Sequence, residues 1–121
     1  MASQFQSKGK HFGDWRLGRR EPGYVYLIYT GIDYKIGKAF NVRRRIIALR
    51  AEGIITNGAY LVKTIHCEYS YDLERQLHEL FGHRHITREF FALTEEEAAW
   101  ITELPDDLPH GLIDDVPVLP K

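Results

Sequence analysis

The sequence contains a single cysteine, Cys67, and no uninterrupted apolar run long enough to cross a membrane. One cysteine excludes an internal disulfide framework and any zinc site built from several cysteines, and it suits a reducing compartment. Residues 1–20 are polar and basic, without the hydrophobic stretch of a secretory signal. We therefore expect a cytoplasmic protein without membrane association, in which Cys67 is a small buried side chain.

Short motifs of several common catalytic sites are also missing. The sequence has no G-x-x-x-x-G-K-[ST], G-x-G-x-x-G or G-x-S-x-G, so nucleotide hydrolysis, dinucleotide binding and serine-esterase chemistry have no support. His78, His83 and His85 lie close together, but neither H-E-x-x-H nor a paired cysteine motif accompanies them. The pattern favours an exposed basic turn at His83 and His85, and a supporting or packing role for His78, over zinc.

The residues that are present suffice for one compact domain. Of 121 residues, 44% are hydrophobic and 12% are aromatic, which provides a core and argues against a disordered chain. Residues 23–103 carry the regular hydrophobic pattern and are predicted to form this domain. Residues 1–22 are predicted to form a basic N-terminal arm, and residues 104–121 an irregular acidic tail rich in proline.

The net charge of −1 conceals a strong segregation of charge along the chain. Residues 1–50 have a net charge of +8, residues 51–93 of −2 and residues 94–121 of −7. A basic half of this kind indicates a polyanionic partner, although an ordinary solvated surface is the alternative. The acidic tail either folds over the basic face as a phosphate mimic or increases solubility.

Hydrophobic periodicity predicts strands and helices along the domain. The continuous apolar run at residues 24–29 is typical of a strand covered on both faces. Thr94 and Glu97 form a capping box, which predicts the start of a helix. The predicted strands cover residues 24–29, 34–38 and 59–66, with a short extended segment over residues 89–93. The predicted helices cover residues 42–52, 70–81 and 94–103, the second beginning at Ser70 or Asp72.

Arg45 and Glu74 are the two charged residues that the helical pattern singles out. Each lies at the edge of the apolar stripe of its predicted helix. A guanidinium there is costly to desolvate without an anion, which is either an external phosphate or an internal carboxylate, Glu74 or Glu89. Glu74 is a candidate ligand for Mg²⁺, which prefers carboxylate and water oxygens; a merely solvated glutamate is the alternative.

Four features then occur in a characteristic order. They are Gly23-Tyr24-Val25-Tyr26 on the first strand, Lys35-Ile36-Gly37 on the second, Arg45 eight residues after that glycine, and Glu74 on the next helix. In order, spacing and placement they resemble the GIY-YIG nuclease superfamily over about residues 23–101. The chain is most similar to a small phage and bacterial branch, whose V-Y-L-I, K-I-G, R-R, L-E-x-x-L-H-x-x-F and E-[WF]-F correspond here to residues 25–28, 35–37, 44–45, 73–81 and 89–91.

The resemblance implies an α+β fold with a small three-stranded antiparallel sheet flanked by about three helices. It also implies a DNA endonuclease or nickase that hydrolyses phosphodiester bonds through one divalent ion, Mg²⁺ or Mn²⁺. Tyr26 would activate or position the attacking water, Arg45 would clamp the phosphate, and Glu74 would bind the ion. Charge that develops on the phosphate oxygens would then meet a guanidinium and a cation. The further candidates for contacts to phosphate or DNA are Lys38, Arg43, Arg44 and His78.

The sequence departs from the superfamily in three places. Lys35 stands where many members have a tyrosine, and its positive charge beside Tyr26 would attract a tyrosinate, so the exchange can preserve activity. Tyr34 should face the opposite side of the sheet. Leu49 replaces a histidine found in some relatives, and residues 89–91 replace a late asparagine. Lys35 is therefore counted among the catalytic candidates with Tyr26.

A non-catalytic subunit is the alternative to an enzyme. Such a subunit would bind nucleic acid or a protein partner with the same fold but without the chemistry. The chain leaves no room for the separate DNA-binding domain that related nucleases often carry. If the chain is a nuclease, we therefore expect a partner protein to supply DNA specificity.

Overall fold

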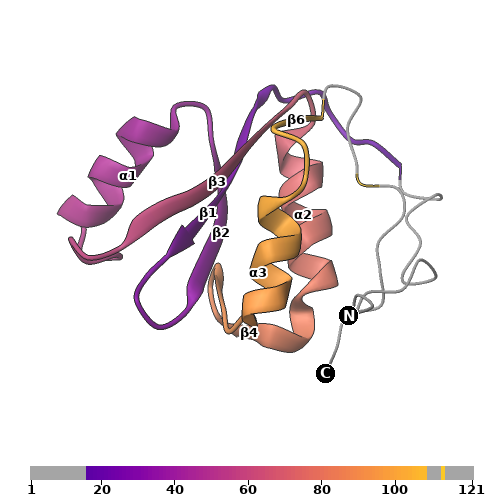
Figure 1. Ribbon diagram of the computed structural model, residues 1–121. Coiled ribbons are helices and arrows are strands. Elements are labelled where there is room, and N and C mark those ends of the chain that lie inside the picture. Colours follow the sequence, from indigo (N-terminus) through magenta and orange to yellow (C-terminus); the bar gives the residue numbers. More distant parts are fainter. Residues whose placement is uncertain (1–15, 109–112, 114–121) are drawn as a thin grey trace.

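The computed structural model describes residues 16–108 and Ile113. These residues form three helices and one sheet of six strands (Figure 1). The strands are β1 (Gly23–Tyr29), β2 (Tyr34–Ala39), β3 (Tyr60–Cys67), β4 (His85–Thr87), β5 (Phe90–Phe91) and β6 (Asp107–Leu108). The helices are α1 (Val42–Ala51), α2 (Ser70–Leu80) and α3 (Glu95–Thr102), and a 3₁₀ turn spans Gly82–Arg84.

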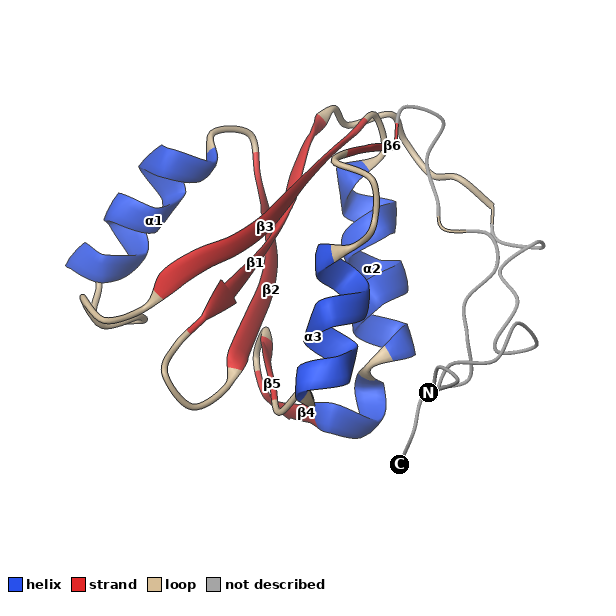
Figure 2. Cartoon of the chain, in the orientation of Figure 1, coloured by secondary structure: helices blue, strands red, loops and turns tan. Residues whose placement is uncertain are grey.

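The sheet has the strand order β4-β5-β2-β1-β3-β6 (Figure 2). Strand β1 is central and pairs in antiparallel fashion with β2 and β3, whereas β6 runs parallel to β3. The predicted α+β class is confirmed. The prediction of a three-stranded sheet is wrong in number, because three strands of only two or three residues extend it at the edges. Such short segments carry no measurable hydrophobic period.

Successive residues of β1 pack on opposite faces of the sheet. Val25 and Leu27 belong to the core beneath α2 and α3, whereas Tyr26 and Ile28 pack with Leu49 of α1. Figure 1 shows α1 on one side of the sheet and the other two helices on the opposite side. The prediction of a strand covered on both faces is confirmed, and Tyr26 is thereby directed toward the α1 side.

The helix boundaries follow from their caps. The Asn41 side chain accepts a hydrogen bond from the backbone N–H of Arg44 at 3.0 Å, which starts α1. The predicted capping box of α3 is present: Glu97 N–H donates to Thr94 Oγ1 at 3.1 Å, and Thr94 N–H donates to Glu97 Oε1 at 2.8 Å. Local sequence therefore fixes where these two helices begin.

Much of the predicted arm and tail lies outside the described residues, which begin at residue 16 and omit 109–112 and 114–121. The prediction of an irregular chain after Pro105 is wrong at β6, where the backbone pairs with the edge of β3. In the described part of the tail, Asp106 pairs with Lys63 and Asp107 with His66, both on β3. The phosphate-mimic hypothesis for the remaining tail stays a prediction.

The described residues also test the expectations for Cys67 and for membrane-spanning helices. Cys67 is fully buried, as predicted for a small core side chain. Across residues 16–108, the structure contains no helix with the length and apolar character needed to span a bilayer.

Candidate active site

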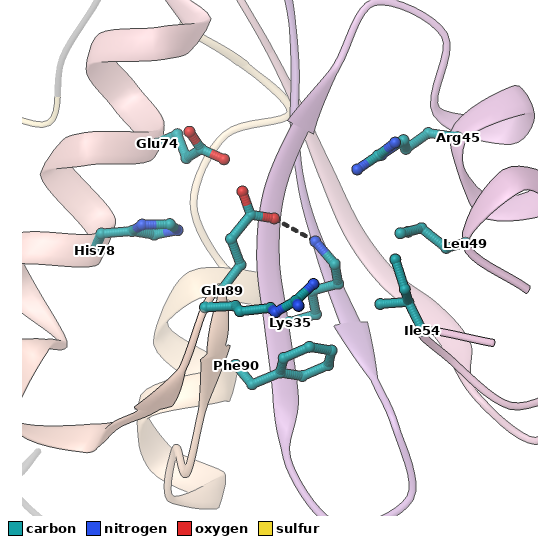
Figure 3. A pocket seen from close by; sticks show the side chains of 9 residues that line it. Lys35, Arg45, Leu49, Ile54, Glu74, His78, Glu89 and Phe90 are labelled. Carbon is teal, nitrogen blue, oxygen red and sulfur yellow. Dashed lines mark hydrogen bonds and ion pairs between the residues drawn. The ribbon is translucent and has the colours of Figure 1, made fainter. Parts of the chain in front are cut away.

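A cavity of about 500 Å³ opens beside β2 (Figure 3). Its lining comes from β2, α1 with the loop that follows it, α2, and the turn between β4 and β5. The lining residues are Lys35, Arg45, Leu49, Ile54, Glu74, His78, Arg88, Glu89 and Phe90. In Figure 3, Glu74 and His78 of α2 lie on one side of the cavity and Arg45 on the other, with Glu89 and Lys35 between them.

Three of the four predicted catalytic residues, Lys35, Arg45 and Glu74, thus border one space. Tyr26 is the exception, because it is buried and is not among the lining residues. Its hydroxyl instead accepts a hydrogen bond from the Lys35 ammonium at 3.1 Å. Tyr26 is therefore linked to the cavity through Lys35.

Glu74 is a buried carboxyl group that faces this cavity. The residue is only 7% exposed, and its Oε2 atom has no hydrogen-bond partner in the described structure. Burial, and secondarily the neighbouring Glu89 carboxylate, raise the pKa of Glu74 from 4.5 to about 7, while Lys38 and Lys35 oppose the shift. An unsatisfied buried carboxyl oxygen of this kind is suited to a cation.

The Lys35 side chain is buried between two partners. Its ammonium group forms an ion pair with Glu89, 54 residues away in the sequence, and donates to the Tyr26 hydroxyl. The sequence analysis expected the positive charge of Lys35 to interact with Tyr26 and named no other partner. In the structure the Glu89 carboxylate neutralises much of that charge, and Lys35 holds the other two side chains in place.

Gly37 permits this arrangement because it pairs with Tyr26 across the β1–β2 ladder. A Cβ atom added at Gly37 would lie 2.6 Å from Cζ of Tyr26 and 2.9 Å from Oε1 of Glu89. Both distances are shorter than van der Waals contact. The glycine of the K-I-G motif is thus required by the close approach of two candidate site residues.

We expect Gly37→Ala to displace the Tyr26 and Glu89 side chains. Overpacking of this kind should destabilise the fold by about 1–3 kcal/mol. Gly82→Ala is the matched control, because a Cβ there meets no atom within 4 Å. Thermal unfolding checks both variants, and a Gly37→Ala protein with the melting temperature of the wild type would show that the space beside Gly37 is not tightly filled.

Arg45 is exposed and directed to the cavity from α1 (Figure 3). The helical pattern indicated a desolvated guanidinium with a phosphate or an internal carboxylate as its partner. Within residues 16–108, neither Glu74 nor Glu89 forms an ion pair with Arg45. The side chain can therefore receive an external anion without first breaking an internal pair.

The remaining predicted DNA contacts are distributed differently. Arg43 and Arg44 are exposed on α1 but do not line the cavity, so the structure favours Arg45 over Arg44 as the cavity arginine. The Lys38 ammonium pairs with Glu21 at 3.0 Å and lies 6.0 Å from the centre of the Tyr71 ring. Lys38 consequently lies outside the cavity.

His78 lines the cavity and is held by the backbone of β2. Its Nε2 atom lies 2.8 Å from the carbonyl oxygen of Ile36, which can only accept, so Nε2 donates this hydrogen bond. The expected supporting role is compatible with this bond. His83 approaches the buried Glu97 at 3.4 Å, and His85 bonds the Arg88 carbonyl at 2.7 Å, so neither adds to the cavity.

The sequence analysis named Glu89 as a possible ion-pair partner of Arg45 and gave Arg88 and Phe90 no site role. All three residues, from the turn after β4 and the start of β5, line the cavity, and Arg88 adopts a left-handed conformation with φ of 50°. This is a sparsely populated conformation for a residue other than glycine. The available signal was the Glu89-Phe90-Phe91 motif, whose glutamate proves to be the partner of Lys35.

The carboxyl groups of the cavity fit a hard cation bound mainly by non-protein oxygens. The described residues contain no group of three or more His, Cys, Asp and Glu side chains placed to hold a metal ion. Mg²⁺ commonly keeps several waters and binds one or two carboxylates together with substrate phosphate. Glu74, with its unpartnered Oε2 and with Glu89 nearby, meets that requirement.

Comparison with protein families gives a match over more than half of the chain. The T5orf172 domain, which has a GIY-YIG-like fold related to nucleases, matches residues 23–104. No curated protein and no solved structure matches the chain. The matched segment includes every strand and helix from β1 to α3 and all the residues that line the cavity. The chain belongs to the T5orf172 domain family, which is associated with nuclease and DNA-binding functions.

Proposed function

We propose that this protein is a DNA endonuclease that requires one divalent cation, Mg²⁺ or Mn²⁺. One observation carries the proposal: among the described residues, a buried carboxyl group with an unpartnered oxygen, on Glu74, and a guanidinium without an internal ion pair, on Arg45, border the same open cavity. A guanidinium and a carboxylate-held cation at one phosphate can together stabilise the charge that develops during phosphodiester hydrolysis. Membership of a nuclease-associated family supports DNA as the substrate.

Arg45 binds and orients the scissile phosphate in this proposal. Its planar guanidinium offers paired N–H donors to two phosphate oxygens, and its exposed position lets a phosphate enter from solvent. Glu74 would hold the divalent ion through its unpartnered oxygen. When bound, the ion supplies electrostatic stabilisation of the negative charge that develops on the phosphate oxygens.

Glu89 and Tyr26 both contact the Lys35 ammonium but differ in their access to the cavity. Glu89 lines the cavity and so reaches a water placed there, whereas in the described structure the Tyr26 hydroxyl bonds the Lys35 ammonium and does not line the cavity. We assign to Glu89 the acceptance of a proton from the attacking water, and to Tyr26 the positioning of Lys35. This differs from the role that the resemblance implies for Tyr26, because a buried phenol behind Lys35 does not contact a cavity water.

Incubation with supercoiled plasmid tests the proposal. With Mg²⁺ or Mn²⁺ we expect conversion first to nicked circles, because the cavity described above accommodates one scissile phosphate at a time, and no conversion with EDTA. Restoring the cation after EDTA should restore cleavage. Tight DNA binding without cleavage in either cation would contradict the enzyme and favour a non-catalytic binding subunit.

The raised pKa of Glu74 predicts a pH-dependent cation affinity. A cation competes with the proton for this carboxyl group, whose pKa is raised to about 7 by burial. Below that pH, Mn²⁺ affinity should fall about tenfold per pH unit as one proton must be released, and above it affinity should level off. Calorimetric titration across pH measures this, with Glu74→Gln as the control. Equal affinity on both sides of pH 7 would contradict Glu74 as the ligand.

A further inference from the structure

A second cavity, of about 380 Å³, lies where the residues preceding β1 meet the first turn of α2. Three arginines line it: Arg16 and Arg19 from the arm, and Arg75 from α2. Tyr71, which is 50% exposed, lies among them. None of the residues lining this cavity is shared with the candidate active site.

The arm is fixed to the helix by buried polar contacts. Asp72 is 2% exposed, and its carboxylate accepts a hydrogen bond from the backbone N–H of Gly18 at 2.9 Å. Glu21 bonds through its backbone to Glu68 at 2.8 Å and to Ser70 at 3.0 Å. These bonds hold the backbone on either side of Arg19 and place the arm arginines beside α2.

The carboxylates near this cavity are already engaged. Asp72 accepts from Gly18 and forms an ion pair with Arg75 at 3.9 Å, and the Glu21 carboxylate pairs with the Lys38 ammonium at 3.0 Å. Within the described residues, neither Arg16 nor Arg19 forms an ion pair. The cavity therefore presents an excess of positive charge to solvent.

Tyr71 adds an aromatic surface between cations. Its ring centre lies 5.7 Å from the Arg75 guanidinium carbon and 6.0 Å from the Lys38 ammonium. Basic grooves that contain exposed aromatic rings are typical of surfaces that follow a nucleic-acid strand. The composition of the cavity thus favours a polyanion over an isolated acidic side chain.

Strand β2 passes close to both cavities. It carries Lys35, which lines the active-site cavity, and Lys38, which pairs with Glu21 and lies 6.0 Å from the ring centre of Tyr71. Glu21 and Tyr71 line the arginine cavity. Tyr71 and Glu74 are also three residues apart on α2, so their Cβ atoms lie roughly 5–6 Å apart. Successive phosphates of one duplex strand advance by about 3.4 Å along the helix axis, so a strand that runs from the active site along α2 passes the arginines.

We propose that Arg16, Arg19 and Arg75 form a second phosphate-binding site for the DNA backbone, next to the scissile phosphate. This inference rests on the proposed function, because it names the flank of the same substrate. The site positions the strand and reads no base, so it raises affinity for every sequence alike.

The test compares Arg16→Ala/Arg19→Ala with Arg20→Ala in binding a labelled DNA duplex in EDTA, where cleavage is excluded. Arg20 is the matched control, because it belongs to the same arm but pairs with Glu68 and does not line the cavity. Each phosphate contact contributes about 0.9 to the slope of log affinity against log salt. The double variant should lower that slope by about 2 and the control by less than half as much. Both exposed positions should leave the melting temperature unchanged.

The results of these measurements distinguish a failure of the arginine site from a failure of the proposed endonuclease function. In the presence of Mg²⁺, the double variant should raise KM and leave kcat at saturating DNA unchanged. A double variant with the slope and KM of the wild type would overturn the arginine site while leaving the endonuclease intact. A salt slope that depends on the arginines, in a protein that never cleaves, would support this site and overturn the endonuclease. Absence of DNA binding by the wild type would overturn both.

Discussion

Glu74→Gln is expected to abolish cation-dependent DNA cleavage and, at the same time, to stabilise the metal-free protein. The amide keeps the shape of the side chain but binds a divalent ion poorly, so the several kcal/mol that an ion contributes to phosphoryl chemistry are lost. We expect a fall in cleavage rate of at least about 1,000-fold. Single-turnover cleavage at saturating Mg²⁺ measures it.

The gain in stability follows from the direction of the pKa shift. Burial raises the pKa of Glu74 in the folded protein to about 7 from 4.5, so the folded state binds this proton more tightly than the unfolded state. The metal-free wild type should therefore lose stability as pH rises from about 4.5 through 7, whereas Glu74→Gln should not. At about pH 8 the variant should be more stable by on the order of 1–3 kcal/mol.

Urea unfolding in EDTA at several pH values provides the measurement. The advantage of the variant should vanish below about pH 4.5, where the glutamate is protonated in both states. Equal stability of the two proteins at every pH would show that the carboxyl group is well solvated. Cleavage at the wild-type rate by Glu74→Gln would show that Glu74 takes no part in the reaction.

Arg45→Ala is expected to lower kcat about 100- to 1,000-fold, the effect of removing a preorganised donor to a developing negative charge. Arg45→Lys should recover only part of the loss, because an ammonium cannot offer two parallel donors to the phosphate. Stability should change by less than about 0.5 kcal/mol, since Arg45 is exposed and has no internal ion pair in the described structure.

Arg44→Ala is the control on the same helix. Arg44 is exposed like Arg45 but does not line the cavity, so its removal should alter KM by a few fold and leave kcat unchanged. Steady-state cleavage of a short duplex separates the two parameters. Equal losses of kcat in Arg44→Ala and Arg45→Ala would show that general positive charge, rather than the cavity, determines activity.

The long strands and the helices were predictable from the sequence because their side chains repeat with a clear period. The continuous run at residues 24–29 identified β1 to within one residue, and the cap at Asn41 located α1. The order and spacing of the motifs also predicted that Lys35, Arg45 and Glu74 lie close together, and in the structure all three line one cavity. These features depend on local sequence or on the topology of the domain.

Other features depend on tertiary contacts that no local pattern records. The partner of Lys35 is Glu89, 54 residues away, and the pairing exists only because β5 adds to β2. The helical pattern placed Arg45 at the edge of the apolar stripe of its helix. It could not show that an open cavity, rather than a packed core, lies beside that edge. Likewise, no local pattern shows that the Tyr26 ring packs against the backbone of Gly37, where its hydroxyl is covered by Lys35.

A crystal structure of the protein with Mn²⁺ and a phosphorothioate DNA duplex would show directly whether Glu74 and Arg45 act on one phosphate. We predict an anomalous peak for one ion about 2.1 Å from a Glu74 carboxylate oxygen, with a backbone phosphate between that ion and the Arg45 guanidinium. An ion bound away from Glu74, or DNA bound on another face with the cavity empty, would contradict this prediction.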